Sequence, residues 1–249
     1  MHRRKQGHVS GLEHLAPSSL RTLAEQPLLA TGGTVLIYLV GSRISRASGH
    51  HPILNLTLLA IVIVACCLDA IGIPYETYLR AADHIHFMLG PAVVLLSVPL
   101  FRQRATICGS APLIALALTI GLPIGIISGA GIAWALGASP RVVLSLAPKS
   151  VTSGIALGIS EQIGGVPGLT VVVVIMTGIT GAVLGPIITR LAKIEDARIV
   201  GLAMGIASHG IGTARALQIG ETAGAFSGLG MALNGVLTSV LLPVIIYFI

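Results

Sequence analysis

Three long stretches of this chain contain no charged side chain. No Asp, Glu, Lys or Arg occurs in residues 105–140, 162–189 or 222–249. A helix needs about 20 apolar residues to cross the hydrocarbon core of a bilayer, so each stretch is long enough to do so. Only 10% of the 249 residues are charged, whereas a soluble domain has about 25%. We therefore expect lipid, rather than water, to surround much of this chain.

The apolar runs also indicate the kind of secondary structure. Within lipid, only α-helices and closed β-barrels pair all of their backbone polar groups. Barrel strands alternate apolar and polar residues over about 10 positions, but the runs "TVVVVIMTG" and "LLAIVIVACC" do not alternate. The sequence thus predicts an all-α, polytopic helical membrane protein, in which most of the 31 glycines allow close helix packing.

Candidate membrane segments follow a polar N-terminal tail at residues 1–25. We expect about seven or eight of them, forming a single transmembrane domain that covers residues 26–249. The basic residues lie mainly in the tail and between segments; between segments they set orientation, so the net charge of +6 indicates no nucleic-acid partner. The tail histidines are interpreted as solvated residues, and neither a metal nor a cofactor is expected. The approximate segments are 27–45, 52–71, 84–101, 109–137, 141–163, 168–190, 198–219 and 223–249.

One segment differs from the others because polar residues interrupt it. Residues 146–165 read "LAPKSVTSGIALGISEQIGG". Pro148 and Gly154 would loosen a helix there, and Ser150, Thr152 and Ser153 would supply hydroxyl groups. A kinked packing helix, whose hydroxyls bond to its own backbone, is the alternative.

The distribution of basic loops also marks this segment. If Arg43 and Arg46 are cytoplasmic, simple alternation of spans puts the basic loop at 190–198 outside, against the positive-inside rule. The rule is restored if segment 141–163 enters and leaves on one side, or if residues 105–140 contain an extra crossing. Polarity and orientation therefore both favour a broken or re-entrant segment at 141–163.

A second stretch of the chain resembles this one. Residues 147–169 align with residues 207–229, which places Glu161 opposite Glu221 and Lys149 opposite His209. In transporters, paired segments interrupted by Gly or Pro lie at the substrate site near the bilayer midplane. We therefore predict two broken or re-entrant segments that are related by an internal repeat.

Ionisable residues inside a membrane are costly and are usually functional. Lys149, His209 and Arg215 fall in the two repeat segments, and together they would form a cationic site. A small carboxylate is the expected ligand, since Arg binds it with two parallel hydrogen bonds and Lys with a compact charge. The hydroxyls of the first segment would complete this substrate-binding site.

The acidic residues and a buried amide have competing interpretations. Glu161 and Glu221 would either carry protons or coupling ions, or form salt bridges with the cations, and structural pairing is favoured. Asn234 lies within an apolar run, where a hydrogen bond between helices is favoured over a ligand role.

Several of these blocks resemble the LrgB family. The resemblance covers residues 30–249 and rests on "LAPKSVTSGIALGISEQIGGVPGLT", "TGITGAVLGPIITRLAKI", "RIVGLAMGIASHGIGTARAL" and "GAFSGLGMALNGVLTSVLLP". The upstream blocks "GIPYETY" and "FMLGPAVVLLSVPLFRQ" agree with it. One departure is Ser153-Gly154, where the family pattern often has Thr-Pro.

The resemblance implies a multi-pass protein of a bacterial inner membrane with an LrgA-type small membrane protein as partner. It also implies two functional interpretations: control of murein hydrolase activity and autolysis in the manner of a holin or antiholin, or transport of small monocarboxylates such as pyruvate. A plastid relative moves glycolate and glycerate. We also expect a homo-oligomer.

The residues favour the transport interpretation. A holin needs spans that oligomerise, but it has no need of paired broken segments that carry Lys, His and Arg. An intramembrane enzyme is the third interpretation, with Lys149 and Ser150 or Ser208 and His209 as a nucleophile pair. Adjacent residues on a helix do not face each other, and no third orienting group is evident. We therefore expect a monocarboxylate transporter and no catalytic residue.

Overall fold

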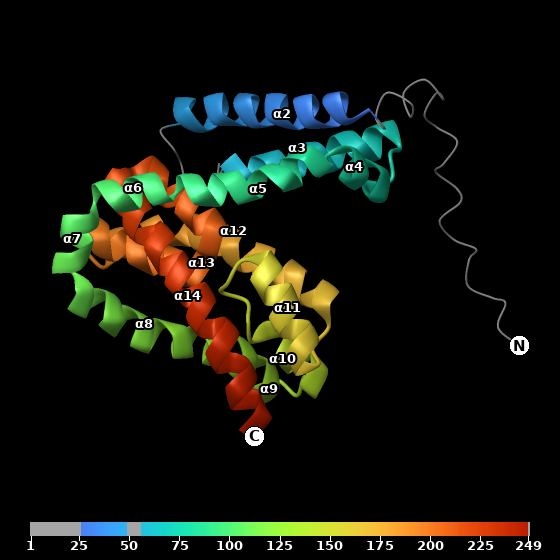
Figure 1. The fold of residues 1–249 in the computed structure, drawn as a ribbon. Helices are drawn as coiled ribbons and strands as arrows, with labels where there is room; N and C mark the ends of the chain where they lie inside the picture. The colour runs from blue at the N-terminus through green and yellow to red at the C-terminus, as the bar shows by residue number, and fades with distance from the viewer. Residues whose placement is uncertain (1–25, 49–55, 249) are drawn as a thin grey trace, which may run out of the picture. The chain divides into compact units, whose positions relative to one another are not determined.

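The computed structural model describes residues 26–48 and 56–248, and the predicted polar tail at 1–25 lies outside them. Every regular element in these ranges is a helix (Figure 1). This confirms the predicted all-α class. The chain divides into two compact units, one ending at Leu95 and the other covering Leu96–Ile249. The single transmembrane domain expected over residues 26–249 stays a prediction.

The first unit contains four described helices: α2 (Pro27–Ala47), α3 (Leu56–Ile71), α4 (Tyr75–Ala81) and α5 (Asp83–Leu95). The chain bends by 117° between α3 and α4. Gly72 has φ 70 at this bend, a conformation that only glycine adopts easily. The Thr34 hydroxyl and the Tyr78 hydroxyl are 2.9 Å apart and hold α4 to α2.

The second unit contains the two segments that the repeat predicts. Its described elements are α6 (Ser97–Arg102), α7 (Arg104–Gly109), α8 (Ala111–Ile126), the π-helix η2 (Ile127–Gly131), α9 (Ile132–Ala135), α10 (Pro140–Leu146), α11 (Ser153–Ile163), α12 (Pro167–Leu191), α13 (Ala197–Ile219) and α14 (Glu221–Phe248).

Close contact between α13 and α14 forms the centre of this unit (Figure 1). Gly201 and Gly205 lie one turn apart on α13, and a Cβ at either position would overlap the backbone of Ala223 or Ser227 on α14. Small residues at this spacing let two membrane helices approach closely. Phe226 is fully buried beside this contact. The glycine-rich composition therefore serves helix packing here, as the sequence indicates.

Fewer membrane spans are found in the described residues than the predicted seven or eight. By length and composition, five helices could cross a membrane, or six if the bent pair α3 and α4 forms one span. Against a count of six, the difference falls on the expected segments 141–163 and 198–219; against a count of five, it also includes α3, which has only 16 residues. Segment 141–163 is divided into two short helices, and the polar residues of α13, including His209 and Arg215, reduce its hydropathy. The count of seven or eight is therefore not confirmed.

Candidate ligand site at two helix breaks

The first break separates α10 from α11. Helix α10 ends at Leu146, turns occupy residues 147–151, and α11 begins at Ser153. Thr152 has the extended conformation, φ −63 and ψ 150, of the residue before a helix. Pro148 removes one backbone donor from this stretch, so the helix cannot run through it with all of its hydrogen bonds. The predicted interruption of segment 141–163 is confirmed.

Buried hydroxyls tie the two short helices to α12. The Ser145 hydroxyl accepts a hydrogen bond of 2.7 Å from the Val166 backbone N–H. The Thr170 hydroxyl lies 2.7 Å from the Ser160 hydroxyl and 3.0 Å from the Ser145 carbonyl oxygen. Ser145, Ser160 and Thr170 are fully buried. This network fixes the ends of α10 and α11 against one helix, so that the break between them has a defined shape.

The second break lies within α13 at His209. Its backbone angles, φ 42 and ψ −133, are not helical, and a residue with a side chain rarely adopts them. The His209 ring Nε2 lies 3.0 Å from the Val174 carbonyl oxygen of α12. Since a carbonyl oxygen only accepts, Nε2 is the donor. The Thr213 hydroxyl donates to the His209 carbonyl oxygen at 2.9 Å and satisfies a group at the kink.

Asn234 of α14 connects the two breaks. Its side-chain Nδ2 donates to the Ser150 carbonyl oxygen at 3.3 Å and to the Ile206 carbonyl oxygen at 3.1 Å. Ser150 belongs to the first break, and Ile206 lies three residues before the second. Asn234 is fully buried. The predicted hydrogen bonding between helices at Asn234 is confirmed, and its partners are the backbone groups of both repeat segments.

Lys149, in the first break, lines two cavities on different sides of α13. One cavity, of about 510 Å³, lies between α8 and α13, and the other, of about 440 Å³, lies between α12 and α13. Lys149 and Ala207 belong to the lining of both cavities. The Lys149 side chain is half-buried. The Lys149 side chain therefore borders both cavities.

The π-helix η2 makes room for this lysine. A Cβ at Gly129 would lie 2.8 Å from Lys149 Cδ and 3.0 Å from the Leu146 carbonyl oxygen, so a larger residue would displace the lysine stem. Gly125, one turn earlier, faces the Ser150 hydroxyl in the same way. Single-turn π-helices occur frequently at functional sites. The glycines of "GIISGAG" thus keep the apolar stem of Lys149 packed while its ammonium reaches the cavities.

The remaining predicted site residues differ in whether they line one of the two cavities. Ser150 lines the cavity between α8 and α13. Thr152 and Ser153 lie at the start of α11. Among the described residues that line the two cavities, neither His209 nor Arg215 occurs. The structure therefore brings Lys149 and Ser150 together at a cavity, and the ligand roles of the other residues stay predictions.

Arg215 and the two glutamates lie away from this lysine's cavities. Arg215 is half-buried, and its Nη1 donates to Gln218 Oε1 at 2.9 Å. Glu221 lies 3.7 Å from Arg102, with both side chains well exposed. Exposed ion pairs of this kind contribute little to stability. Glu161 is exposed on α11. A structural pairing is thus found for Glu221, with Arg102 as the partner.

Sequence reasoning did not assign the hydroxyl side chains of the second cavity to the site. Thr177 and Thr180 of α12 and Ser208 of α13 line the cavity between these helices, together with Lys149. Thr177 and Thr180 are three residues apart and therefore lie on one face of α12. This polar pair in an otherwise apolar helix is the signal that could have identified them.

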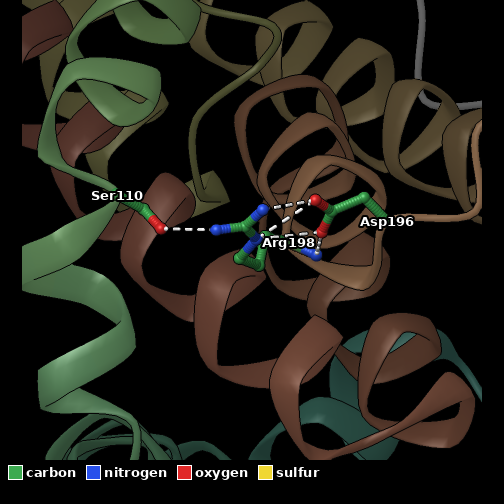
Figure 2. A network of polar contacts seen from close by, with 3 residues as sticks. All are labelled: Ser110, Asp196 and Arg198. Carbon is green, nitrogen blue, oxygen red and sulfur yellow. Dashed lines mark hydrogen bonds and ion pairs between the residues drawn. The ribbon is translucent and has the colours of Figure 1, made fainter.

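A polar network joins the loop between α12 and α13 to the start of α8 (Figure 2). Arg198 Nη1 donates to the Ser110 hydroxyl at 3.2 Å, and Arg198 Nη2 donates to Asp196 Oδ2 at 2.6 Å. The Asp196 side chain also accepts a bond from the Arg198 backbone N–H and caps α13. The hydrogen bonds from Arg198 lower the pKa of Asp196 to about 2. Arg198, in the first turn of α13, is therefore neutralised by the residue that caps its own helix.

The helices and the break together define a multi-pass helical membrane protein with a lysine beside two cavities that are partly open to the surroundings. The chain belongs to the LrgB-like family, whose sequence profile matches residues 34–248. This confirms the resemblance that the sequence blocks indicate. No solved structure matches the chain.

The relatives of this chain are bacterial proteins matched over most of their length. The holin-like protein CidB of Staphylococcus aureus is 34% identical over 221 residues, which are 89% of this chain and 96% of the relative. The holin-like protein CidB of Staphylococcus epidermidis is 31% identical over 213 residues, 86% of this chain and 93% of the relative. The uncharacterized protein YxaC of Bacillus subtilis is 36% identical over 196 residues, 79% and 85% of the two chains.

Proposed function

We propose that this protein transports a small monocarboxylate across a membrane and that Lys149 binds the carboxylate. The observation that carries the proposal is that Lys149 lines cavities on two sides of α13. A transporter must expose one binding group first to one space and then to another, and discontinuous helices near the bilayer midplane provide such groups. A lysine at the break between α10 and α11 meets this requirement.

The lining residues suit a small acid that carries a further oxygen. Lys149 would contribute the charge, and the hydroxyls of Ser208, Thr177 and Thr180 in the cavity between α12 and α13 would bond a 2-oxo or 2-hydroxy group. Pyruvate, glycolate and glycerate have this chemistry. Cavities of this volume fall in the range of small-molecule sites.

Holin-like regulation of murein hydrolase activity and autolysis is the second candidate. Its support is that the CidB relatives are named holin-like proteins, a name that favours it more directly than it favours transport. On this proposal the helices would assemble into a lesion or control one, and Lys149 would have no ligand.

Uptake and leakage in the same liposomes separate the two candidates. We expect protein-containing liposomes to take up labelled pyruvate or glycolate and to retain an entrapped fluorescent dye. Lys149→Gln should strongly reduce uptake at low substrate concentration, whereas Lys193→Gln, in the exposed loop after α12, is the matched control and should not. Dye release together with no saturable uptake would overturn the transport proposal and support the holin-like one.

Partners and location extend the same proposal. We propose that the protein resides in a bacterial inner membrane, acts beside an LrgA-type small membrane protein and forms a homo-oligomer. The apolar helices of both units support a bilayer environment. Co-purification of a tagged chain with an untagged copy and with the partner, from native membranes, tests these associations.

A further inference from the structure

The two cavities that share Lys149 have different chemistry. The cavity between α12 and α13 has hydroxyl groups from both helices. The cavity between α8 and α13 is apolar along most of its length, and its described polar lining residues are Lys149, Ser150 and Ser128. The remaining lining residues are Leu113, Leu116, Ala117, Ile120, Gly121, Ile124, Gly125, Ile199, Leu202, Ala203, Ile206 and Ala207. A ligand that fills this cavity needs an extended apolar part.

The polar residues of this cavity gather at one end. Gly125 faces the Ser150 hydroxyl, and Gly129 faces the Lys149 stem, so the lysine lies beside the last turn of α8. The apolar lining continues from there to Leu113 on α8 and Ile199 on α13. Between Ile199 and Ala207, α13 rises by about 12 Å. The cavity is therefore elongated, with a cation at one end.

At the opposite end, the described lining residues are apolar. Arg198 directly precedes Ile199 and is paired with Asp196 at 2.6 Å, while its Nη1 is bonded to Ser110. A second carboxylate at this end would meet a guanidinium that an aspartate already neutralises. The far end of a ligand should therefore carry no charge.

We propose that the cavity between α8 and α13 binds a monocarboxylate with an apolar chain, such as a medium-chain fatty acid. The carboxylate binds Lys149 and Ser150, and the chain lies between α8 and α13 toward Leu113 and Ile199. The proposal rests on the carboxylate-binding role proposed for Lys149. Because the small substrate needs the same ammonium, a fatty acid in this cavity excludes it and acts as a competitive inhibitor.

Photolabelling tests the site independently of transport. The full-length protein in nanodiscs is labelled with an octanoate that carries a diazirine at its chain end, and the labelled residues are mapped by mass spectrometry. Labels are expected on α8 and α13 near Leu113 and Ile199, with an at least tenfold reduction in Lys149→Gln and retention in Lys149→Arg. Excess octanoate should remove the label, whereas octanol, which lacks the carboxylate, should not.

Each outcome decides one of the two proposals. Labels spread over lipid-facing residues, or competition by octanol as strong as by octanoate, would overturn the fatty-acid site and leave the transport proposal standing. Competition by an anionic phospholipid and not by octanoate would also overturn it, because the occupant would then be a lipid. Charge-dependent labelling at Leu113 and Ile199 without any uptake of pyruvate or glycolate would support the site and contradict transport.

Discussion

The two helix breaks differ in the surroundings of the residue at the break. At the first break, Lys149 is half-buried and lines two cavities. At the second, His209 is buried, and its ring is bonded to the Val174 carbonyl oxygen of the neighbouring helix. The first break presents a charged group to open space, whereas the second encloses its polar group.

This difference indicates that two helix breaks in one protein can have different roles: one fixes a bend, and the other presents a charged side chain. A break costs backbone hydrogen bonds, which must be satisfied elsewhere. At the second break, the Thr213 hydroxyl bonds the His209 carbonyl oxygen and the Asn234 amide bonds the Ile206 carbonyl oxygen, while the His209 ring fastens the bend to α12. At the first, the hydroxyls of Ser145, Ser160 and Thr170 hold the helix ends, which leaves Lys149 available for a ligand.

Neutralising Lys149 should have the largest effect and tests this division directly. Lys149→Gln removes a charge-assisted bond of about 1.5–3 kcal/mol, so the apparent affinity for the small acid should fall by about one to two orders of magnitude. His209→Gln should change affinity far less and lower the melting temperature instead. Initial uptake rates at varied substrate concentration, with matched protein amounts, measure both variants. Equal losses of affinity would contradict the assignment of different roles.

Removing the Asn234 amide should destabilise both breaks together. Asn234→Leu leaves the buried Ser150 and Ile206 carbonyl groups without this donor, at about 1–3 kcal/mol for each unsatisfied group. The melting temperature in detergent should fall by several degrees. Ser239→Ala, which removes an exposed hydroxyl bonded within the same helix, is the control. A variant as stable as the control would show that the breaks do not depend on their shared amide.

Filling the space at Gly178 should affect the second break alone. A Cβ at Gly178 would lie 2.8 Å from His209 Nε2 and from Ile211 Cδ1, and overpacking of this kind costs about 1–3 kcal/mol. Gly178→Ala should therefore reduce stability. Gly168→Ala lies on the same helix with open space around it and should be neutral or slightly stabilising. Equal melting temperatures for Gly178→Ala and Gly168→Ala would contradict the close packing of His209 against α12.

The ion pair beyond the apolar end of the α8–α13 cavity should give the smallest effect, with a defined pH dependence. The pKa of Asp196 is about 2 in the folded protein and 3.8 without its partners. Its stabilisation is therefore fully present above about pH 3.8 and is lost as the pH falls toward 2. Asp196→Asn keeps a good helix cap and removes only the charge. The difference in melting temperature between wild type and variant should be constant near neutral pH and vanish near pH 2.

The helix positions could be predicted because the lipid solvent simplifies the pattern. The charge-free run at 162–189 predicts α12 at Pro167–Leu191, and the run at 222–249 predicts α14. Pro148 marks the first break for a local reason, since proline lacks a backbone donor. The π-helix at Ile127–Gly131 could not be predicted, because its sequence, ISGAG, contains no charged residue or proline that would mark a change of helix type.

The site could be predicted only in part. Lys149 and Ser150 follow from polarity at a helix break. The direction of the His209 side chain could not be predicted. Predictions from helical spacing assume a rotation of about 100° per residue, and the backbone at His209, with φ 42, departs from it. The side chains after His209, including Arg215, follow the kink, and neither His209 nor Arg215 is among the described residues that line the two cavities, so the cationic site expected for them with Lys149 stays a prediction. Thr177 and Thr180 could not be assigned to the candidate site from the sequence, because single hydroxyls in apolar helices commonly bond to their own backbone.

The backbone contact between α13 and α14 has a mechanical consequence. Where Gly201 and Gly205 meet Ala223 and Ser227, no side-chain layer separates the helices, so neither can slide or rotate without a steric clash. The two helices are therefore expected to move together as one rigid body. Any rearrangement within this unit is therefore expected on the other faces of α13, toward α8 and α12, where the two cavities leave space.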